Sequence, residues 1–361
     1  MKRWILALLV LAAQWAWADK GHIWPRPVGL SETSQKAIIL HNRDEEVLIL
    51  GVELQAQVAT GILEFIPFPS EPKVTLAEGN PFEQAGRLIR AKGLEIESRH
   101  PVKGGAASHG AVEIRFSEKV GLHDVTVIKI NDAKGLTEWV NAFFKGKGIE
   151  AKPELDRVIP IAEDYLRRGF PYFVFDYVPV QPETKFIEAL TYRFKTERLY
   201  YPLKTSNIVS GKGAVEAILL LPGSFVFESE PEKEMRFWTI LRGLSSANPD
   251  GWRLSSSAKI VPAEAKALYP EAERFFRKTP KLYLQVLEFR GDYGFRDDLL
   301  LDLSFLAPYA YKLPAMDFGS HGYFFDKFSS EEIKDYCEAK PDSPMSKLWL
   351  GETKRSPKRK K

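Results

Sequence analysis

The stretch KAIILHNRDEEVLILGVEL, residues 36–54, decides the fold class of this chain. Residues 36–41 and 47–54 are rich in Ile, Leu and Val, and polar residues separate the two runs. Two such runs joined by a short polar connection are typical of a β-hairpin. The stretch therefore predicts two antiparallel strands, with Asp44, Glu45 and Glu46 in a solvated turn.

Apolar and aromatic runs elsewhere predict more strands. Residues 283–289 alternate with period two, which indicates a strand with one buried face. The strand at 62–67 meets a proline-rich segment and ends there, because proline cannot donate a hydrogen bond to the ladder. The other predicted strands are residues 112–116, 125–130, 172–178, 187–194, 199–203, 215–221, 236–241 and 299–305.

Helix signals are fewer than strand signals. Asn80 followed by Pro81 is a good helix start, and Asn131 or Asp132 can cap an amphipathic helix that ends before two glycines. Further helices are predicted at residues 154–168, at 262–278 and near 331–337.

Many strands separated by only a few helices favour an α+β fold over a doubly wound sheet. We predict a β-rich N-terminal domain of mostly antiparallel sheet with two or three helices, and a smaller α+β C-terminal part. The predicted boundaries are 1–18 for a signal peptide, 19–245 for the β-rich domain, 246–350 for the C-terminal region and 351–361 for a disordered basic tail.

The first eighteen residues have the three parts of a secretory signal peptide. Lys2 and Arg3 precede a short apolar run, and residues 16–18 form an A-x-A cleavage signature. The apolar run is too short for a membrane-spanning helix of about 20 residues. We expect cleavage after Ala18 and a soluble product without a transmembrane segment, located in the periplasm or outside the cell.

Charge is unevenly distributed along the chain. The formal net charge is +3, but residues 354–361 contain six basic residues and no acidic one, which leaves the body mildly acidic. A nucleic-acid binder spreads Lys and Arg over a folded face, so this distribution argues against such a partner. The single cysteine, Cys337, excludes an intramolecular disulfide.

Several segments, in a fixed order across residues 34–221, resemble an uncharacterised bacterial domain-of-unknown-function family of exported proteins. The resemblance implies export but no activity, cofactor or catalytic residue. Many relatives end in a hydrophobic anchor, whereas this chain ends in Lys and Arg. The matching segments are QKAIILHNRDEEVLIL (35–50), FIPFPSEPKV (65–74), VGLHDVTVIKINDAKGLTEWV (120–140), RRGFPYFVFDYVPV (167–180) and TERLYYPLKTSN (196–207), with FRGDYGFRDDLLLDL (289–303) as a weaker continuation.

Catalytic and metal-binding motifs are scarce. The six histidines form no helical pair at ligand spacing, so the sequence predicts no metal site and no cofactor. The candidates for catalysis are the neighbouring Asp297 and Asp298, with solvated loop acids as the alternative, and His109 beside Ser108 in a glycine-rich loop. No G-x-S-x-G elbow accompanies them.

Two proline- and tyrosine-containing segments, residues 67–72 and 200–203, are candidates for a groove that holds an extended peptide or a sugar ring. The alternative is that they are turns at strand ends. The basic tail is the candidate for binding anionic surfaces, because each Lys or Arg near such a surface contributes on the order of 1 kcal/mol. Its cations are Lys354, Arg355, Lys358, Arg359, Lys360 and Lys361.

These observations favour an exported, non-catalytic envelope protein that binds a protein partner or an anionic cell-surface polymer. The alternative is an exported hydrolase with an acidic or a Ser/His site.

Overall fold

The computed structural model describes residues 20–25, 30–31, 35–56, 60–94, 123–150, 153, 155–180, 185–208, 212–225, 231–279, 281–308 and 310. Several predicted features lie outside these residues: the signal peptide, the loop that contains His109, the strand at 112–116, the helix near 331–337 with Cys337, and the whole basic tail.

Eight strands form the large sheet, in the order β13-β14-β11-β3-β4-β9-β6 with β2 paired to β4. The pairing of β3 with β11 is parallel, and the other pairings in this sheet are antiparallel. The strands are β2 (Leu30–Ser31), β3 (Gln35–His41), β4 (Glu45–Ala56), β6 (Lys73–Leu76), β9 (Lys185–Lys195), β11 (Lys212–Leu221), β13 (Trp252–Ile260) and β14 (Leu282–Asp292).

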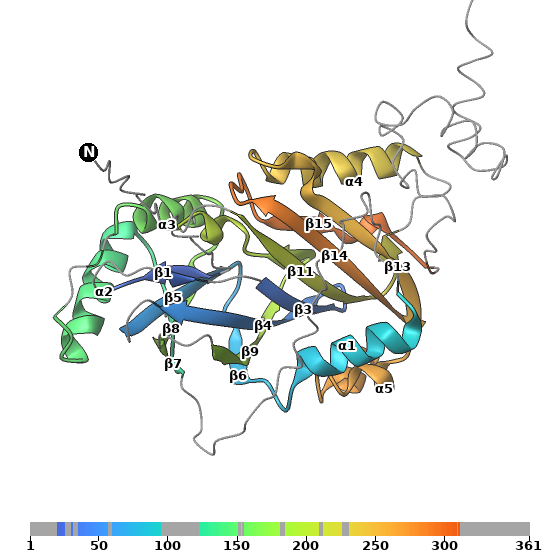
Figure 1. Ribbon diagram of the computed structural model, residues 1–361, viewed down its shortest axis with the longest axis horizontal. Helices are drawn as coiled ribbons and strands as arrows, with labels where there is room; N and C mark the ends of the chain where they lie inside the picture. Colours follow the sequence, from blue (N-terminus) through green and yellow to red (C-terminus); the bar gives the residue numbers. More distant parts are fainter. Residues whose placement is uncertain are drawn as a thin grey trace, which may run out of the picture.

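A smaller sheet of four strands, in the order β1-β5-β8-β7, lies beside the large one (Figure 1). Two further pairs, β10 with β15 and β12 with β16, are antiparallel. These strands are β1 (Gly21–Ile23), β5 (Thr60–Phe68), β7 (Asp124–Lys129), β8 (Tyr172–Val180), β10 (Arg198–Tyr201), β12 (Ser224–Phe225), β15 (Leu299–Asp302) and β16 (Leu306–Ala307).

The helices cover the sheets from several sides (Figure 1). Helices α2 and α3 lie at the end of the molecule that contains the small sheet, α4 lies beside β14 and β15, and α1 and α5 lie on the opposite side. The helices are α1 (Pro81–Lys92), α2 (Ala133–Gly146), α3 (Val158–Arg167), α4 (Pro231–Leu244), α5 (Pro262–Ala265) and α6 (Ala272–Phe275), with 3-10 turns η1 (Lys204–Ile208), η2 (Pro249–Gly251) and η3 (Leu303–Phe305). None of these described helices has the length and apolar composition needed to cross a bilayer.

The central strands of the large sheet are buried on both faces. Ala37 and Ile39 of β3 belong to a core shared with the small sheet, α2, α3 and α4. Ile38 and Leu40 of the same strand belong to a second core under α1, α5 and α6. Successive side chains of a strand point to opposite faces, so burial on both faces explains why this strand is a continuous apolar run.

The α+β fold class and the opening hairpin are confirmed. β3 and β4 pair in register from Gln35 opposite Val52 to His41 opposite Glu46. The predicted helix start is also confirmed, because the Asn80 side chain accepts a hydrogen bond from the Glu83 amide at the head of α1. The division at residue 245 stays a prediction; β13 and β14 pair within the same sheet as β11.

The prediction of a strand at residues 236–241 is wrong, because these residues lie in the middle of α4. Phe237, Trp238, Leu241 and Leu244 are buried. Their spacing of one, three and three residues is that of one face of a helix. A short apolar run in the sequence does not distinguish such a helix from a buried strand.

Prolines shortened two predicted helices. The helix expected at 262–278 is two single turns, α5 and α6, and Pro270 lies between them. The helix expected at 154–168 begins only at Val158. Pro160 explains this start, since its ring would clash with the carbonyl of the residue four positions earlier if the helix began sooner.

Two strands of the C-terminal region also differ from expectation. β13 was not predicted, because its centre is Ser255, Ser256 and Ser257. β14 was expected to have one buried face, but it is buried on both faces from Leu282 to Phe289. A central strand tolerates the buried Gln285 because its amide donates to the Phe225 and Ser255 carbonyls and accepts from the Phe225 amide.

Candidate functional site

Asp298 is fully buried, so the expectation of a solvated loop acid is wrong for this residue. Its Oδ1 accepts hydrogen bonds from the Tyr165 hydroxyl at 2.7 Å and the Lys204 amide at 2.9 Å, and its Oδ2 accepts one from Arg168 at 2.8 Å. Burial raises the pKa of Asp298 despite the nearby Arg168 charge. These three donors come from α3, the residue after α3, and η1.

Asp297 has a half-exposed side chain and accepts a 2.6 Å hydrogen bond from Arg168. Its other contact is the Asp298 amide at 2.8 Å. The Arg168 guanidinium also lies over the Tyr165 ring, 4.4 Å from its centre. The sequence candidates Asp297 and Asp298 are therefore together in space, in a cluster that joins α3 and η1 to the loop before β15.

A second group of buried charges lies on the small sheet. Glu64 accepts from Lys20 Nζ at 2.6 Å and lies 3.3 Å from His22 Nε2. Although burial alone would raise the pKa of Glu64, the Lys20 charge and the His22 contact lower it. These contacts attach the short β1 to β5, which pair antiparallel.

His123 links three strands next to this group. Its Nδ1 lies 2.5 Å from Asp176 Oδ2 on β8, and its Nε2 lies 2.9 Å from the Glu188 carbonyl on β9. The contacts place β7, which starts at the next residue, against both sheets. Among the described residues, no three His, Cys, Asp or Glu side chains are arranged to hold a metal ion.

A hollowed surface lies where the β3–β4 turn meets β6, β9 and the end of α6. The Asn42 side chain positions this turn: its oxygen accepts from the Asp44 and Glu45 amides, and its nitrogen donates to the Phe275 carbonyl at 3.1 Å. Arg43 adopts a positive φ of 87° in the turn. Asn42 thereby fixes the hairpin against α6.

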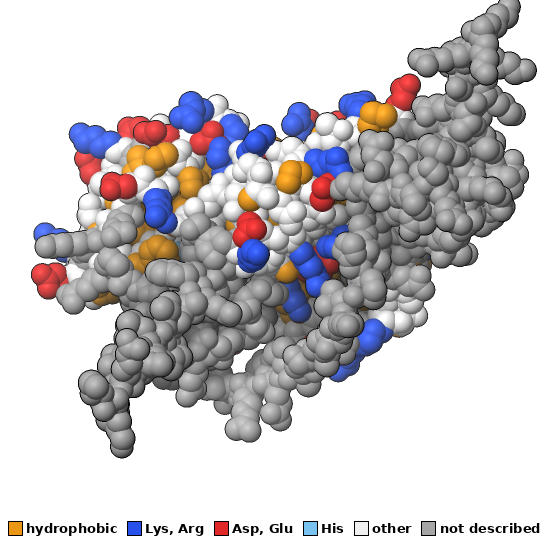
Figure 2. All heavy atoms as spheres, turned by 45° about the horizontal axis from the view of Figure 1, so that its top comes forward, with side chains coloured by type: hydrophobic (Ala, Val, Ile, Leu, Met, Phe, Trp, Pro, Cys, Tyr) orange, Lys and Arg blue, Asp and Glu red, His pale blue; other side chains and the backbone are white. Residues whose placement is uncertain are grey.

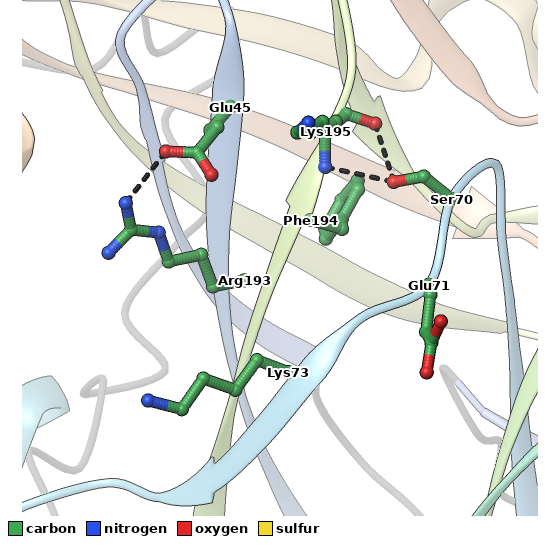
Figure 3. A pocket seen from close by; sticks show the side chains of 7 residues that line it. All are labelled: Glu45, Ser70, Glu71, Lys73, Arg193, Phe194 and Lys195. Carbon is green, nitrogen blue, oxygen red and sulfur yellow. Dashed lines mark hydrogen bonds and ion pairs between the residues drawn. The ribbon is translucent and has the colours of Figure 1, made fainter.

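Two adjacent hollows, which we call the groove, open at this place. The first has a volume of about 420 Å³ and is shown in Figure 3. The second has a volume of about 470 Å³ and reaches the segment after α6. Both hollows are lined by Glu45, Arg193 and Lys195, so the two hollows adjoin at these three side chains.

The groove is rich in positive charge. Six basic and three acidic side chains line the two hollows. Arg193 is paired, with Nη2 at 2.7 Å from Glu45 and Nη1 at 3.3 Å from Glu271. Within the described part of the chain, the other five basic side chains have no ion pair: Lys73, Lys195, Arg274, Arg277 and Lys278.

The polar groups of the groove do not form a nucleophile with a base. The Ser70 hydroxyl donates to the Lys195 carbonyl at 2.8 Å and accepts from the Lys195 amide at 2.9 Å, as the dashed lines in Figure 3 show. Its only lining neighbours with acid or base character are Glu45, Glu71 and the Lys and Arg side chains. These two hydrogen bonds hold the Ser70 hydroxyl against the backbone of Lys195.

The proline-rich candidate segment contributes to the groove through Ser70 and Glu71. The other candidate segment does not, because Tyr200 and Tyr201 are fully buried in the core. Glu46 is buried too, in contrast to the expected solvated turn, and accepts from the Tyr200 amide at 2.8 Å. His109 and the six tail cations lie outside the described residues.

Sequence reasoning missed the groove because its charges come from distant parts of the chain. The one local signal is the presence of Arg274, Arg277 and Lys278 within five residues. The helix predicted at residues 262–278 would place them at its end, where cations complement the dipole. On the face that Figure 2 shows, the visible described side chains mix basic and acidic groups with small apolar spots.

Comparison with solved structures finds the crystal structure of baculovirus P35, with a TM-score of 0.40 and 10% sequence identity over 78% of this chain and 98% of that one. No curated protein matches the chain. Residues 29–221 match a family described as an uncharacterized protein conserved in bacteria, DUF2330. This match spans more than half of the sequence, and the chain therefore belongs to the DUF2330 family.

Proposed function

We propose that this protein is an exported, non-catalytic binding protein of the bacterial envelope, and that the groove binds an anionic partner. The observation that carries the proposal is the set of five basic side chains in the groove without an ion pair among the described residues. Unpaired cations gathered in a concavity attract anions and raise their local concentration.

The signal-like first eighteen residues support export. Cleavage after Ala18 would leave the folded part intact, because the described structure includes Lys20 as a buried partner of Glu64. The alternative of an exported hydrolase has less support, since the Asp298 oxygens already accept three hydrogen bonds.

Cell fractionation tests the proposal. We expect the protein in the envelope fraction, beginning at Asp19, and released by high salt because surface charge interactions are screened. Arg274→Gln/Arg277→Gln/Lys278→Gln should move a larger share into the soluble fraction. The matched control, Lys129→Gln/Lys134→Gln/Lys145→Gln, removes the same charge from exposed positions on β7 and α2.

An intact Met1 on protein recovered from the cytosol contradicts export. Equal retention of the groove triple variant and the control triple variant contradicts a role for the groove. The basic tail is tested separately with Lys358→Gln/Arg359→Gln/Lys360→Gln, because tail attachment and groove attachment should weaken independently.

A further inference from the structure

We infer that the ligand of the groove is a linear polyanion that occupies both hollows at once, a flexible chain with closely spaced phosphate or carboxylate groups and no aromatic bases. This inference rests on the proposed function and narrows it to one class of ligand.

The unpaired cations are distributed over both hollows. Lys73 lines only the first hollow, Lys195 lines both, and Arg277 and Lys278 line only the second. In Figure 3, the Lys73 side chain extends toward the same side as Arg193, while Glu71 lies apart from both. A single small anion cannot contact cations in both hollows, whereas a chain of anions can.

Each contact between one of these cations and an anion is weak by itself. Lys73, Lys195, Arg277 and Lys278 are exposed. An exposed ion pair changes an equilibrium by up to about fivefold, because water screens it and two long side chains must be ordered. Useful affinity therefore requires several contacts on one ligand, where each later contact forms at a high effective concentration.

The Arg193–Glu45 pair marks the place where the two hollows meet. Arg193 is held on one side by Glu45 and Glu271 and lies over the Phe275 ring, 5.4 Å from its centre. A guanidinium with two carboxylate partners is already neutralised. We therefore expect the anion to contact the unpaired cations on either side of this pair. Such contacts favour a ligand long enough to extend past it.

The groove lacks the exposed aromatic rings that favour nucleic acid as a ligand. Sequence-tolerant binding of single strands uses aromatic rings on which bases stack. The aromatic residues that line the groove are Phe194 and Phe275, and their exposed fractions are only 2% and 5%. Bases would find no ring surface, so a chain that consists of charged groups alone fits the groove better.

Calorimetric titration of the purified full chain with a series of probes tests the inference. The probes are inorganic phosphate, triphosphate, long-chain polyphosphate, polyglutamate and a single-stranded oligonucleotide. We expect long-chain polyphosphate and polyglutamate to bind at least tenfold more tightly than triphosphate, with affinity that falls steeply with salt. The tail is present in every variant, so differences between variants report on the groove.

Variants of each hollow give the decisive comparison. Lys73→Gln, in the first hollow, and Arg277→Gln/Lys278→Gln, in the second, should each raise the Kd for the long chain, and their combination should multiply the two effects. The Kd for inorganic phosphate should change in the variant of one hollow and stay the same in the variant of the other. Lys129→Gln/Lys134→Gln, on β7 and α2, is the control for loss of charge.

Each adverse outcome has its own meaning. If the combined variant binds the long chain no more weakly than one single-hollow variant, the ligand does not span the groove. If the oligonucleotide binds more tightly than polyphosphate of equal charge, the class of ligand is wrong. If no probe distinguishes the groove variants from the control, the proposed function itself fails.

Discussion

His41 and Glu46 face each other across the β3–β4 hairpin as two fully buried titratable groups. Burial lowers the pKa of His41 to about 4 and raises that of Glu46 well above its usual value. His41 is therefore neutral in the fold near pH 7, and burial favours the protonated form of Glu46 over its carboxylate. Their contributions to stability have opposite dependence on pH, because one is a base and the other an acid.

The pH dependence of His41 follows from its lowered pKa. Between pH 6.5 and 4 the unfolded chain takes up a proton on this residue that the folded chain does not, so stability falls as the pH falls. The full loss is about 3 kcal/mol for a shift of this size. His41→Asn, which keeps an acceptor for the Arg43 amide, should flatten the acid side of the stability curve measured by urea unfolding.

Glu46→Gln provides the opposite control. Above pH 4.5 the unfolded chain loses a proton that the buried Glu46 retains, so the wild type loses stability as the pH rises. The stability of the glutamine variant relative to the wild type should therefore increase as the pH rises. Parallel stability curves for wild type and both variants would falsify the assignment of neutral forms.

Asp297 and Asp298 should differ in their effect on stability although they are neighbours. Asp298→Asn removes a buried partner of Arg168 and should cost about 3 kcal/mol. Asp297→Asn, at a half-exposed position, should cost less than about 1 kcal/mol. Denaturant unfolding of the two variants measures this difference, and equal losses would contradict the structural role of Asp298.

At the scale of elements, helix α1 depends on its cap and on the second core. Asn80 accepts from the Glu83 amide, Pro81 occupies the first turn, and Gly93 ends the helix in the left-handed conformation at φ 62°. Ala85 is buried in the second core, and the partly buried Phe82, Leu88 and Ile89 pack against the same core. A helix of 12 residues is marginal on its own, so its stability depends on this packing and on its end groups.

Asn80→Ala should therefore reduce the free energy of unfolding by about 1 kcal/mol, because the Glu83 amide loses its acceptor. Asn80→Asp keeps the acceptor and should be close to the wild type. Thermal unfolding followed by circular dichroism measures both variants. An alanine variant as stable as the aspartate variant would show that the cap contributes nothing.

At the scale of the whole molecule, the C-terminal strands complete the large sheet. β14 pairs with β11 along ten residue pairs, from Lys212 opposite Asp292 to Leu221 opposite Tyr283. Leu287 and Phe289 belong to the core shared with the small sheet, and Leu284 and Val286 belong to the second core. Removing β14 would expose both cores and leave the apolar β11 as an unprotected edge.

A chain that ends at Ser245 should consequently lose cooperative unfolding and self-associate. The comparison is a chain that lacks only residues 351–361, which should retain a single transition. Denaturant titration and size-exclusion chromatography distinguish the two. A sharp transition and a monomeric truncated chain would instead support an independent N-terminal domain.

The sequence by itself determined the fold class, the opening hairpin, the start of α1 and the family. These features depend on residues close together in the chain, such as the apolar runs of β3 and β4 or Asn80 with Pro81. The tertiary structure was needed for α4, because the apolar run at 236–241 is too short to distinguish a helix from a strand. It was also needed for β13, because the serines at its centre give no apolar pattern.

The candidate site was decided only by the tertiary structure. Asp297 and Asp298 were visible as a pair, but nothing local indicated that Arg168 and Tyr165 bury one of them. The groove brings Lys73, Lys195 and Arg277 together from three separate parts of the sequence. The sequence gives only the net charge of the chain. The attraction of a ligand depends on its distance from each cation and on which cations are already paired. Both are fixed only when the strands and α6 pack together.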